Sequence, residues 1–301
     1  MRLCAGILAA ALFVGCASDV YLDDDYLGAS DAGFTDLTGQ FEDDDPDEER
    51  VIVVADLEDA PERVRRDIGA FLKHHPDGTR VKVTLRTFFD FGHSTSTNTM
   101  QPYVYSIVPV DAEGNKDGVE EVREPRGSAP VRTIPYEAGL RQGIEKVYRT
   151  LGGTRYLAVE VPWEKGVVSG VRRTRHSNGR ARTETQYVDG KATGTTKSYS
   201  ADGKLAREGT MLFGVPHGVR KDYYPDTGQL KRVVPYESGV VNGVVREYYR
   251  DGTLKREMPF ARDCLDGVES QYGGKGELVR ERTWNDGVLV SEREFGRRSA
   301  D

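Results

Sequence analysis

Cysteine is scarce in this chain, which limits how its fold can be held together. The three cysteines among 301 residues are Cys4, Cys16 and Cys264. Cys4 and Cys16 lie in an N-terminal apolar segment, so Cys264 has no obvious partner within the chain. We therefore do not expect a fold stapled by disulfide bonds.

Long hydrophobic runs are missing as well. The longest, residues 3–14, is too short to span a bilayer unaided. Hydrophobic residues make up 37% of the chain and charged residues 30%, which is lean for a thick globular core. Because 34 glycines and 13 prolines indicate many turns, the composition favours an all-β protein with short strands.

The chain also lacks an excess of positive charge. Its formal net charge is −7, but residues 19–50 hold thirteen Asp and Glu against one Arg. With Arg2 added, residues 1–50 contribute −11, so residues 51–301 carry +4. Four charges over that length are far fewer than nucleic-acid binding requires, and we predict no nucleic-acid partner.

Recognisable catalytic groupings are absent from the sequence too. It contains no nucleophile–His–carboxylate set, glycine-rich phosphate loop or metal-ligand spacing. The adjacent His74 and His75 would point about 100° apart on a helix, and no cysteine or carboxylate cluster completes a metal shell around them. We therefore predict that the protein is not an enzyme and has no cofactor or metal site.

What the chain does contain begins with an export signal. After Met1-Arg2, the apolar run ends Phe13-Val14-Gly15-Cys16, which resembles the lipobox of bacterial lipoproteins. The resemblance implies a signal peptide over residues 1–15, acyl chains on Cys16 and an exported, membrane-anchored protein. Ala17-Ser18 lacks the aspartate of an inner-membrane retention signal, so we expect the outer membrane if the host is Gram-negative. An ordinary secretory signal cut after Ala17 is the alternative.

Two segments separate this signal from the second half of the chain. Residues 16–50 are highly charged with too little apolar surface to fold, which predicts an acidic disordered tether. Residues 51–113 predict a small α/β cap. Its expected elements are strands at Val51–Ala55, Arg80–Phe89 and Tyr103–Val110 and a helix from Pro61 to about His74.

A glycine then returns every 24 or 25 residues. Gly166, Gly190, Gly214 and Gly239 head successive repeats, Asp263 takes the next position, and Gly287 resumes the series. Fainter copies begin at Gly114 and Gly139. A fixed period of this kind predicts stacked repeats, which we place over residues 114–296, followed by a tail at 297–301.

Each repeat has the pattern of a β-hairpin. In residues 243–260, two runs that alternate apolar and polar residues flank Asp251-Gly252, which predicts a hairpin with a type I′ turn. The fold class that follows is mainly β: an elongated single-layer antiparallel sheet of repeated β-hairpins, with the small α/β cap at its N-terminal end.

The repeats resemble the MORN repeat family, and in particular its bacterial variant with the pattern Gly-x-x-x-Gly, Tyr-Tyr-x-Asp-Gly-x-Leu-Lys-x-Glu. Residues 239–260 are the closest copy, and 214–236 the next. Arg175 for Tyr and Asp263 for Gly depart from the pattern. The resemblance implies scaffolding or binding. Proteins with this variant are often labelled antitoxins of toxin–antitoxin systems, and the family is also linked to phospholipid binding.

Strand alternation predicts which side chains share a face. We expect the odd positions of the first strand, counted from its glycine, and the even positions of the second strand, counted from the turn glycine, to share one face. This aromatic-aliphatic face also carries arginine and lysine. The candidate ligand residues on it are Lys221, Tyr223, Arg232, Arg246, Tyr248, Arg256, Tyr272 and Arg280. The glutamates expected on the opposite, solvated face are Glu184, Glu208, Glu257 and Glu281. The basic row either binds an extended anionic ligand or lies flat on the tyrosine rings in a structural role.

These observations predict a membrane-anchored, non-enzymatic binding or scaffolding protein of the bacterial cell envelope. The expected partners are the membrane, through lipidated Cys16, and an envelope protein or an anionic polymer or lipid. Two alternatives remain: an antitoxin-like protein that neutralises a toxin, and an envelope enzyme of unknown reaction.

Overall fold

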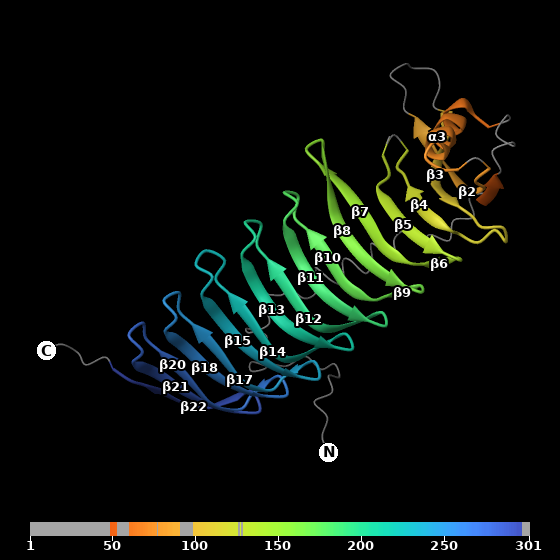
Figure 1. Ribbon diagram of the computed structural model, residues 1–301. Helices are drawn as coiled ribbons and strands as arrows, with labels where there is room; N and C mark the ends of the chain where they lie inside the picture. Colours follow the sequence, from red (N-terminus) through yellow and green to blue (C-terminus); the bar gives the residue numbers. More distant parts are fainter. Residues whose placement is uncertain are drawn as a thin grey trace. The chain divides into compact units, whose positions relative to one another are not determined.

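The computed structural model describes residues 49–52, 60–76, 78–90, 99–125, 127 and 129–296. The predicted signal peptide, Cys16, the tether up to residue 48 and the tail at 297–301 lie outside these residues. The described chain divides into two compact units, which we call the N-terminal unit, up to residue 204, and the C-terminal unit, from residue 205. Figure 1 labels the helix and most of the strands. Within the described residues, no helix has the length and apolarity to cross a membrane.

The N-terminal unit contains one described helix and a series of strands. In chain order these are β1 (Glu49–Ile52), α3 (Glu62–Leu72), β2 (Val81–Asp90), β3 (Thr99–Pro109), β4 (Gly118–Val122), β5 (Arg132–Glu137), β6 (Leu140–Arg141), β7 (Gly143–Leu151), β8 (Thr154–Glu164), β9 (Val167–Val168), β10 (Gly170–Arg175), β11 (Ala181–Val188) and β12 (Lys191–Tyr199). All their pairings are antiparallel. From β1 the order is β2, β3, β4, β5, β7, β8, β10, β11 and β12.

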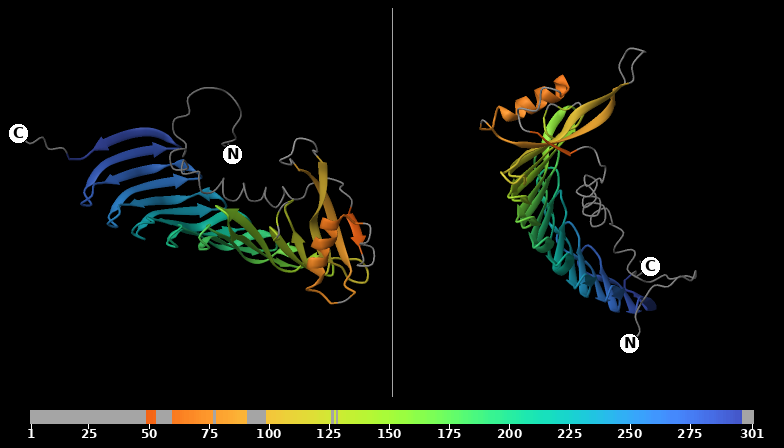
Figure 2. Two further views of the ribbon diagram at one scale, coloured as in Figure 1. Left: turned by 90° about the horizontal axis from the view of Figure 1, so that it is seen from above. Right: turned by 90° about the vertical axis from the view of Figure 1, so that its right-hand side faces the viewer.

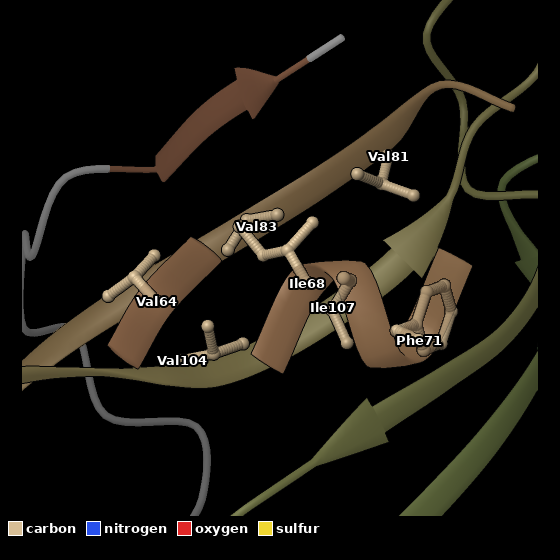
Figure 3. Close-up of a cluster of buried hydrophobic side chains, with 7 residues drawn as sticks. All are labelled: Val64, Ile68, Phe71, Val81, Val83, Val104 and Ile107. Atoms are coloured by element: carbon tan, nitrogen blue, oxygen red, sulfur yellow. The ribbon is translucent and has the colours of Figure 1, made fainter. Parts of the chain in front are cut away.

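Helix α3 and strands β2 and β3 form the predicted small α/β region. The helix begins after Pro61, whose fixed φ and missing N–H suit a helix start, and Glu62 lies in its first turn. One face of the helix packs against the sheet (Figure 3). The buried side chains in this cluster are Val64, Ile68, Phe71, Val81, Val83, Val104 and Ile107. The alternating valines of β2 and the 3–4 spacing along α3 explain why these residues meet.

The C-terminal unit consists of strands. They are β13 (Leu205–Leu212), β14 (Val215–Tyr223), β15 (Leu230–Glu237), β16 (Val240–Val241), β17 (Gly243–Tyr248), β18 (Leu254–Ala261), β19 (Cys264–Leu265), β20 (Gly267–Tyr272), β21 (Leu278–Asn285) and β22 (Val288–Glu294). The long strands pair antiparallel in chain order and lie side by side in one layer (Figure 2). The fold-class prediction of a mainly β protein built from antiparallel hairpins, with a small N-terminal helix, is confirmed.

Two kinds of turn alternate along the repeats. At Ser238-Gly239 both residues have positive φ, +50° and +91°, as a type I′ turn requires. At Asp251-Gly252 only the glycine has positive φ, +88°, and its N–H donates to the Tyr249 carbonyl at 3.0 Å. This is a type I turn followed by a glycine bulge, so the prediction of a type I′ turn at Asp251-Gly252 is wrong. The type I′ turns lie instead at the glycines that head the repeats.

The residue that heads each repeat also bonds to the repeat before it. The Gly239 N–H donates to the Pro216 carbonyl at 2.8 Å, and the Gly287 N–H to the Leu265 carbonyl at 2.8 Å. Asp263 makes the same bond, from its N–H to the Val241 carbonyl, at 2.9 Å. Its φ is +67°, a conformation that favours glycine. Its carboxylate also accepts the Val241 N–H at 2.7 Å. This second bond accounts for an aspartate where the other repeats have glycine.

Candidate binding faces of the repeats

A one-residue register shift decides which side chains share a face. In the hairpin of β17 and β18, Glu247 lies opposite Arg256 but Tyr248 lies opposite Leu254, so Lys255 has no cross-strand partner. Before the shift, Arg246 lies opposite Glu257. Directly opposed residues share a face of the sheet, so Arg246 and Arg256 point to opposite faces. The same shift recurs in the hairpins of β14 with β15 and of β20 with β21.

The C-terminal unit therefore has two distinct faces. We call the side of Val219, Val244 and Val268 the valine face, and the other side the arginine face. Of the candidate ligand residues, the valine face carries Lys221, Tyr223, Arg246, Tyr248 and Tyr272, and the arginine face carries Arg232, Arg256 and Arg280. The prediction that all eight share one face is wrong, because the extra residue of each bulge reverses the parity of the second strand. Their role in binding stays a prediction.

The arginines of the arginine face are held in ion pairs between neighbouring strands. Arg232 Nε donates to Glu247 Oε1 at 3.0 Å, and both side chains are 16% exposed. Arg256 Nε donates to Glu269 Oε1 at 2.6 Å, and Glu269 also accepts the Trp284 indole N–H at 2.8 Å. Glu269 is 2% exposed. Arg280 contacts Glu294 at 2.6 Å.

The apolar core of this unit lies on the same face. Its buried members are Val234, Tyr236, Val241, Val245, Met258, Phe260 and Leu265, and Trp284 packs against them. Because a single sheet must bury apolar surface with its own side chains and those of neighbouring repeats, the ion pairs cover the part of the face that the core does not.

The N-terminal unit repeats this arrangement at lower exposure. Arg132 Nε on β5 donates to Glu145 Oε1 on β7 at 2.7 Å, and the Trp163 indole N–H on β8 donates to Glu145 Oε2 at 2.9 Å. Glu145 is fully buried. In both units the glutamate follows its arginine by 13 residues. The same geometry thus forms even where the repeat sequence is faint.

The first hairpins of the C-terminal unit use aspartate in place of glutamate. Asp222 accepts Arg207 Nε at 2.5 Å and Arg220 Nη2 at 3.3 Å. Arg220 also donates to the Tyr236 hydroxyl at 2.8 Å. Burial raises the pKa of Tyr236, with the Asp222 charge acting in the same direction and the Arg220 charge in the opposite one. The tyrosine therefore stays neutral and completes the network.

The valine face carries a different set of contacts, in which a tyrosine and a cation share one glutamate. Glu257 accepts Arg246 Nε at 2.8 Å and the Tyr272 hydroxyl at 3.5 Å. Glu208 accepts the Tyr223 hydroxyl at 2.6 Å and lies 3.8 Å from Lys221 Nζ. Burial and the bond to Glu208 raise the pKa of Tyr223 to about 12.

The N-terminal unit contains the same triad on the corresponding face. There Glu184 accepts Arg173 Nε at 3.2 Å and the Tyr199 hydroxyl at 3.1 Å. The expectation of a separate solvated glutamate face is therefore wrong for Glu184, Glu208 and Glu257. Glu281, opposite Ser270, is on the valine face as well.

The exposed ends of these triads are positively charged. The Arg246 side chain is 44% exposed and that of its partner Glu257 is 29% exposed. Lys221 is 47% exposed against 32% for Glu208. Because the cation is the more exposed partner each time, an approaching molecule meets the positive charges first.

Exposed apolar side chains run beside the triads. Val219 is 48% exposed and Val268 51%, and Pro235 lies opposite Val219. Pro235 packs against Gly243 so closely that a Cβ on that glycine would lie 3.1 Å from the proline Cγ. The corresponding face of the N-terminal unit has Val119 and Ile144, each 45% exposed, opposite Pro135 and Pro162. Each unit thus carries a row of apolar side chains next to its cations.

Sequence reasoning missed the partners of the predicted cations. Neither the buried glutamates Glu145 and Glu269 nor the two tryptophans that bond them were among the candidates. The spacing that could have found the glutamates is 13 residues from arginine to glutamate. The tryptophans follow their glutamates by 18 residues for Trp163 and 15 for Trp284. Among the described residues, no group of three or more His, Cys, Asp or Glu could hold a metal ion.

A comparison with protein families identifies the repeats. The model of the MORN repeat variant matches residues 192–212 and 241–261. The chain therefore contains MORN-type repeats, which are typical of binding and scaffolding proteins rather than of catalysts. No curated protein matches the chain.

Proposed function

We propose that the protein is a non-enzymatic binding or scaffolding protein of the bacterial cell envelope, anchored in the membrane through acyl chains on Cys16. Its valine face binds a partner protein. The observation that carries this proposal is that the half-exposed Val219 and Val268 share one face with the exposed cations Lys221 and Arg246. An exposed apolar row with a charged border is typical of an interaction site.

The chemistry of the partner follows from the same face. Apolar side chains of the partner would cover Val219, Val244 and Val268, and its acidic side chains would reach Lys221 and Arg246. The tyrosine hydroxyls of Tyr223 and Tyr272 are already bonded to glutamates, so their rings contribute contact area. We therefore infer a protein segment that combines apolar and acidic side chains.

The arginine face has a structural role in this proposal. Arg232, Arg256 and Arg280 are paired within the sheet, and the apolar core lies beside them. A ligand that took these arginines from their carboxylates would leave buried charges such as that of Glu269 uncompensated. Binding to this face would therefore oppose folding.

The anchored location rests on the N-terminal sequence. The lipobox-like residues 13–16 supply the acylation site, and two or three acyl chains at about 0.8 kcal/mol per buried CH₂ hold a protein stably in a membrane. Mass spectrometry of the protein purified from membranes, together with fractionation of Cys16→Ala, tests this location. We expect a lipid-modified Cys16 and release of the variant from the membrane. A cytosolic pool without acyl chains would contradict the anchored role.

Binding is tested with two matched double variants of the full chain. Crosslinking in intact cells, followed by salt-dependent co-purification, identifies the captured protein. We expect K221Q/R246Q to reduce capture at least about tenfold, since two charge contacts are lost. R232Q/R280Q should leave capture of the folded protein unchanged. Equal losses for the two variants would remove the valine face from the proposal.

A further inference from the structure

A pocket outside the repeat faces lies between helix α3 and strand β4. Its volume is about 590 Å³, within the usual range for small-molecule sites. The helix contributes a line of side chains that includes Arg63, Arg66 and Phe71. The strand contributes Glu121, and Arg123 follows directly after it. The pocket belongs wholly to the N-terminal unit.

The charges around this pocket are unbalanced. Three arginines line it, at positions 63, 66 and 123, against the two carboxylates of Asp67 and Glu121. His74 and His75 also line it. The arginines outnumber the carboxylates, so the pocket is electropositive.

Arg123 is the residue that points most directly to a ligand. Its side chain is only 11% exposed, and its Nη2 donates to Glu121 at 2.6 Å. Its Nε is buried and has no hydrogen-bond acceptor among the described residues. A guanidinium has five N–H donors, and a buried donor without an acceptor is costly. An oxyanion in the pocket would supply acceptors to this group.

We propose that this pocket binds the carboxylate or phosphate group of a small anionic ligand, a site separate from the repeat faces of the proposed function. Arg66 and Arg123 bind the anion by charge-assisted hydrogen bonds, which suit planar guanidinium groups. The anion lies toward the first turn of α3, because the carbonyls at the end of the helix repel negative charge. At the C-terminal end of the helix, His75 is already in contact with Phe71. Its Nδ1 lies 3.0 Å from the Phe71 carbonyl, and its ring stacks on the Phe71 ring.

Two sources could supply this oxyanion. One is a free metabolite with carboxylate or phosphate groups. The other is the chain itself, since residues 42–49 read Glu-Asp-Asp-Asp-Pro-Asp-Glu-Glu and the last of them begins β1. β1 pairs with β2, and β2 with β3, which pairs with β4 beside the pocket. Three strand spacings of about 4.8 Å are within reach of an eight-residue segment.

Calorimetric titration of the full chain with citrate and with inorganic phosphate, at low ionic strength, tests the proposal. We expect binding that weakens about three- to tenfold in R66Q and is unchanged in R182Q. Arg66 is 73% exposed, so its replacement does not disturb packing. Arg182 is an exposed arginine of β11 in the same unit and serves as the control. R123Q should abolish binding, provided that thermal unfolding shows it to be folded.

A third variant separates the two sources. In it, the carboxylates at positions 42–45, 47 and 48 are replaced by amides. If this variant binds citrate more tightly than the natural chain, the acidic segment is the internal source of the oxyanion. If the affinity is equal, the ligand is a free anion. Absence of binding in both the natural chain and this variant overturns the proposal, as would equal weakening by R66Q and R182Q.

Discussion

The two faces of the repeats both pair glutamates with cations and aromatic side chains, but they differ in how deeply the glutamates are buried. On the arginine face, glutamates such as Glu145 and Glu269 are 0–2% exposed and accept bonds from an arginine and a tryptophan. On the valine face, glutamates such as Glu208 and Glu257 are about 30% exposed and accept bonds from a cation and a tyrosine. Burial, and not the types of residue present, therefore decides which network stabilises the fold and which is accessible to a partner.

The physical reason lies in the cost of removing charge from water. Removing one partner of a buried ion pair lowers the free energy of unfolding by about 3–5 kcal/mol, because the other charge stays buried without compensation. An exposed ion pair contributes only about 0–1 kcal/mol to stability. The ion pairs of the arginine face must therefore stay intact for the protein to remain folded. On the valine face, a cation can bond to a carboxylate of a partner in place of its own glutamate with little loss of stability, which suits binding.

Glu145→Gln should have the largest effect on this comparison. It removes the fully buried carboxylate that compensates Arg132 and accepts the Trp163 N–H. We expect the free energy of unfolding to fall by about 3–5 kcal/mol in denaturant titrations. Glu184→Gln, on the other face of the same unit, is the matched control and should cost less than about 1 kcal/mol. Similar losses for the two variants would break the distinction between the faces.

Gly243→Ala tests whether the valine face has a packing constraint of its own. Gly243 has a φ of +114°, and a Cβ would lie 3.1 Å from the Pro235 Cγ. We expect a loss of about 2 kcal/mol in thermal or denaturant unfolding. Gly209→Ala is the control, because that glycine has ordinary φ and its Cβ would make a normal contact at 3.5 Å. It should be neutral or stabilise by about 0.5 kcal/mol. If Gly243→Ala leaves the free energy of unfolding unchanged, then Pro235 can move away from an added Cβ and the face has no such packing constraint.

The losses of stability caused by Arg232→Gln and Lys221→Gln compare the two faces within the C-terminal unit. Arg232 makes two short contacts to Glu247 at 16% exposure, whereas Lys221 is 47% exposed and 3.8 Å from Glu208. We expect losses of about 1–2 kcal/mol for Arg232→Gln and of no more than about 0.5 kcal/mol for Lys221→Gln. Equilibrium unfolding of both variants measures the contrast. A larger loss for the lysine variant would reverse the assignment of roles.

The titration of Tyr223 is the smallest effect and the most local. Its pKa is raised from 10.0 to about 12, so the folded state favours the neutral phenol. The stability it contributes is complete below pH 10 and is lost as the pH rises from 10 toward 12. Tyrosinate absorbance should show one group titrating near 12 that disappears in Tyr223→Phe. Glu208→Gln should lower this pKa, and an unchanged titration in that variant would contradict the bond to Glu208.

Much of the fold could be predicted because its signals are local. The helix from Pro61 was expected at the right place, and the repeat period fixed the glycine turns from Gly114 onward. The hairpin around Asp251-Gly252 was also right, although its turn type was not. These features depend on backbone conformations that only a few residue types adopt, so the sequence displays them directly.

The candidate site could be predicted only in part. Arg246 and Arg256 were correctly identified as regularly repeated cations, but they were placed together on one face. The bulge at Lys255 inserts a single residue, and a shift of one residue moves every later side chain to the other face. Strand alternation counted along the sequence does not register such a shift.

The repeat, its hairpins and the candidate cations are therefore evident from the sequence, since period and turn chemistry are properties of neighbouring residues. Which cations are buried with Glu269 and which are exposed on the valine face depends on the tertiary structure. Partners 13 or 15 residues apart meet through cross-strand register, and burial depends on what the adjacent repeats cover. Those two quantities belong to the assembled sheet, and they separate a structural arginine from one that can bind a partner.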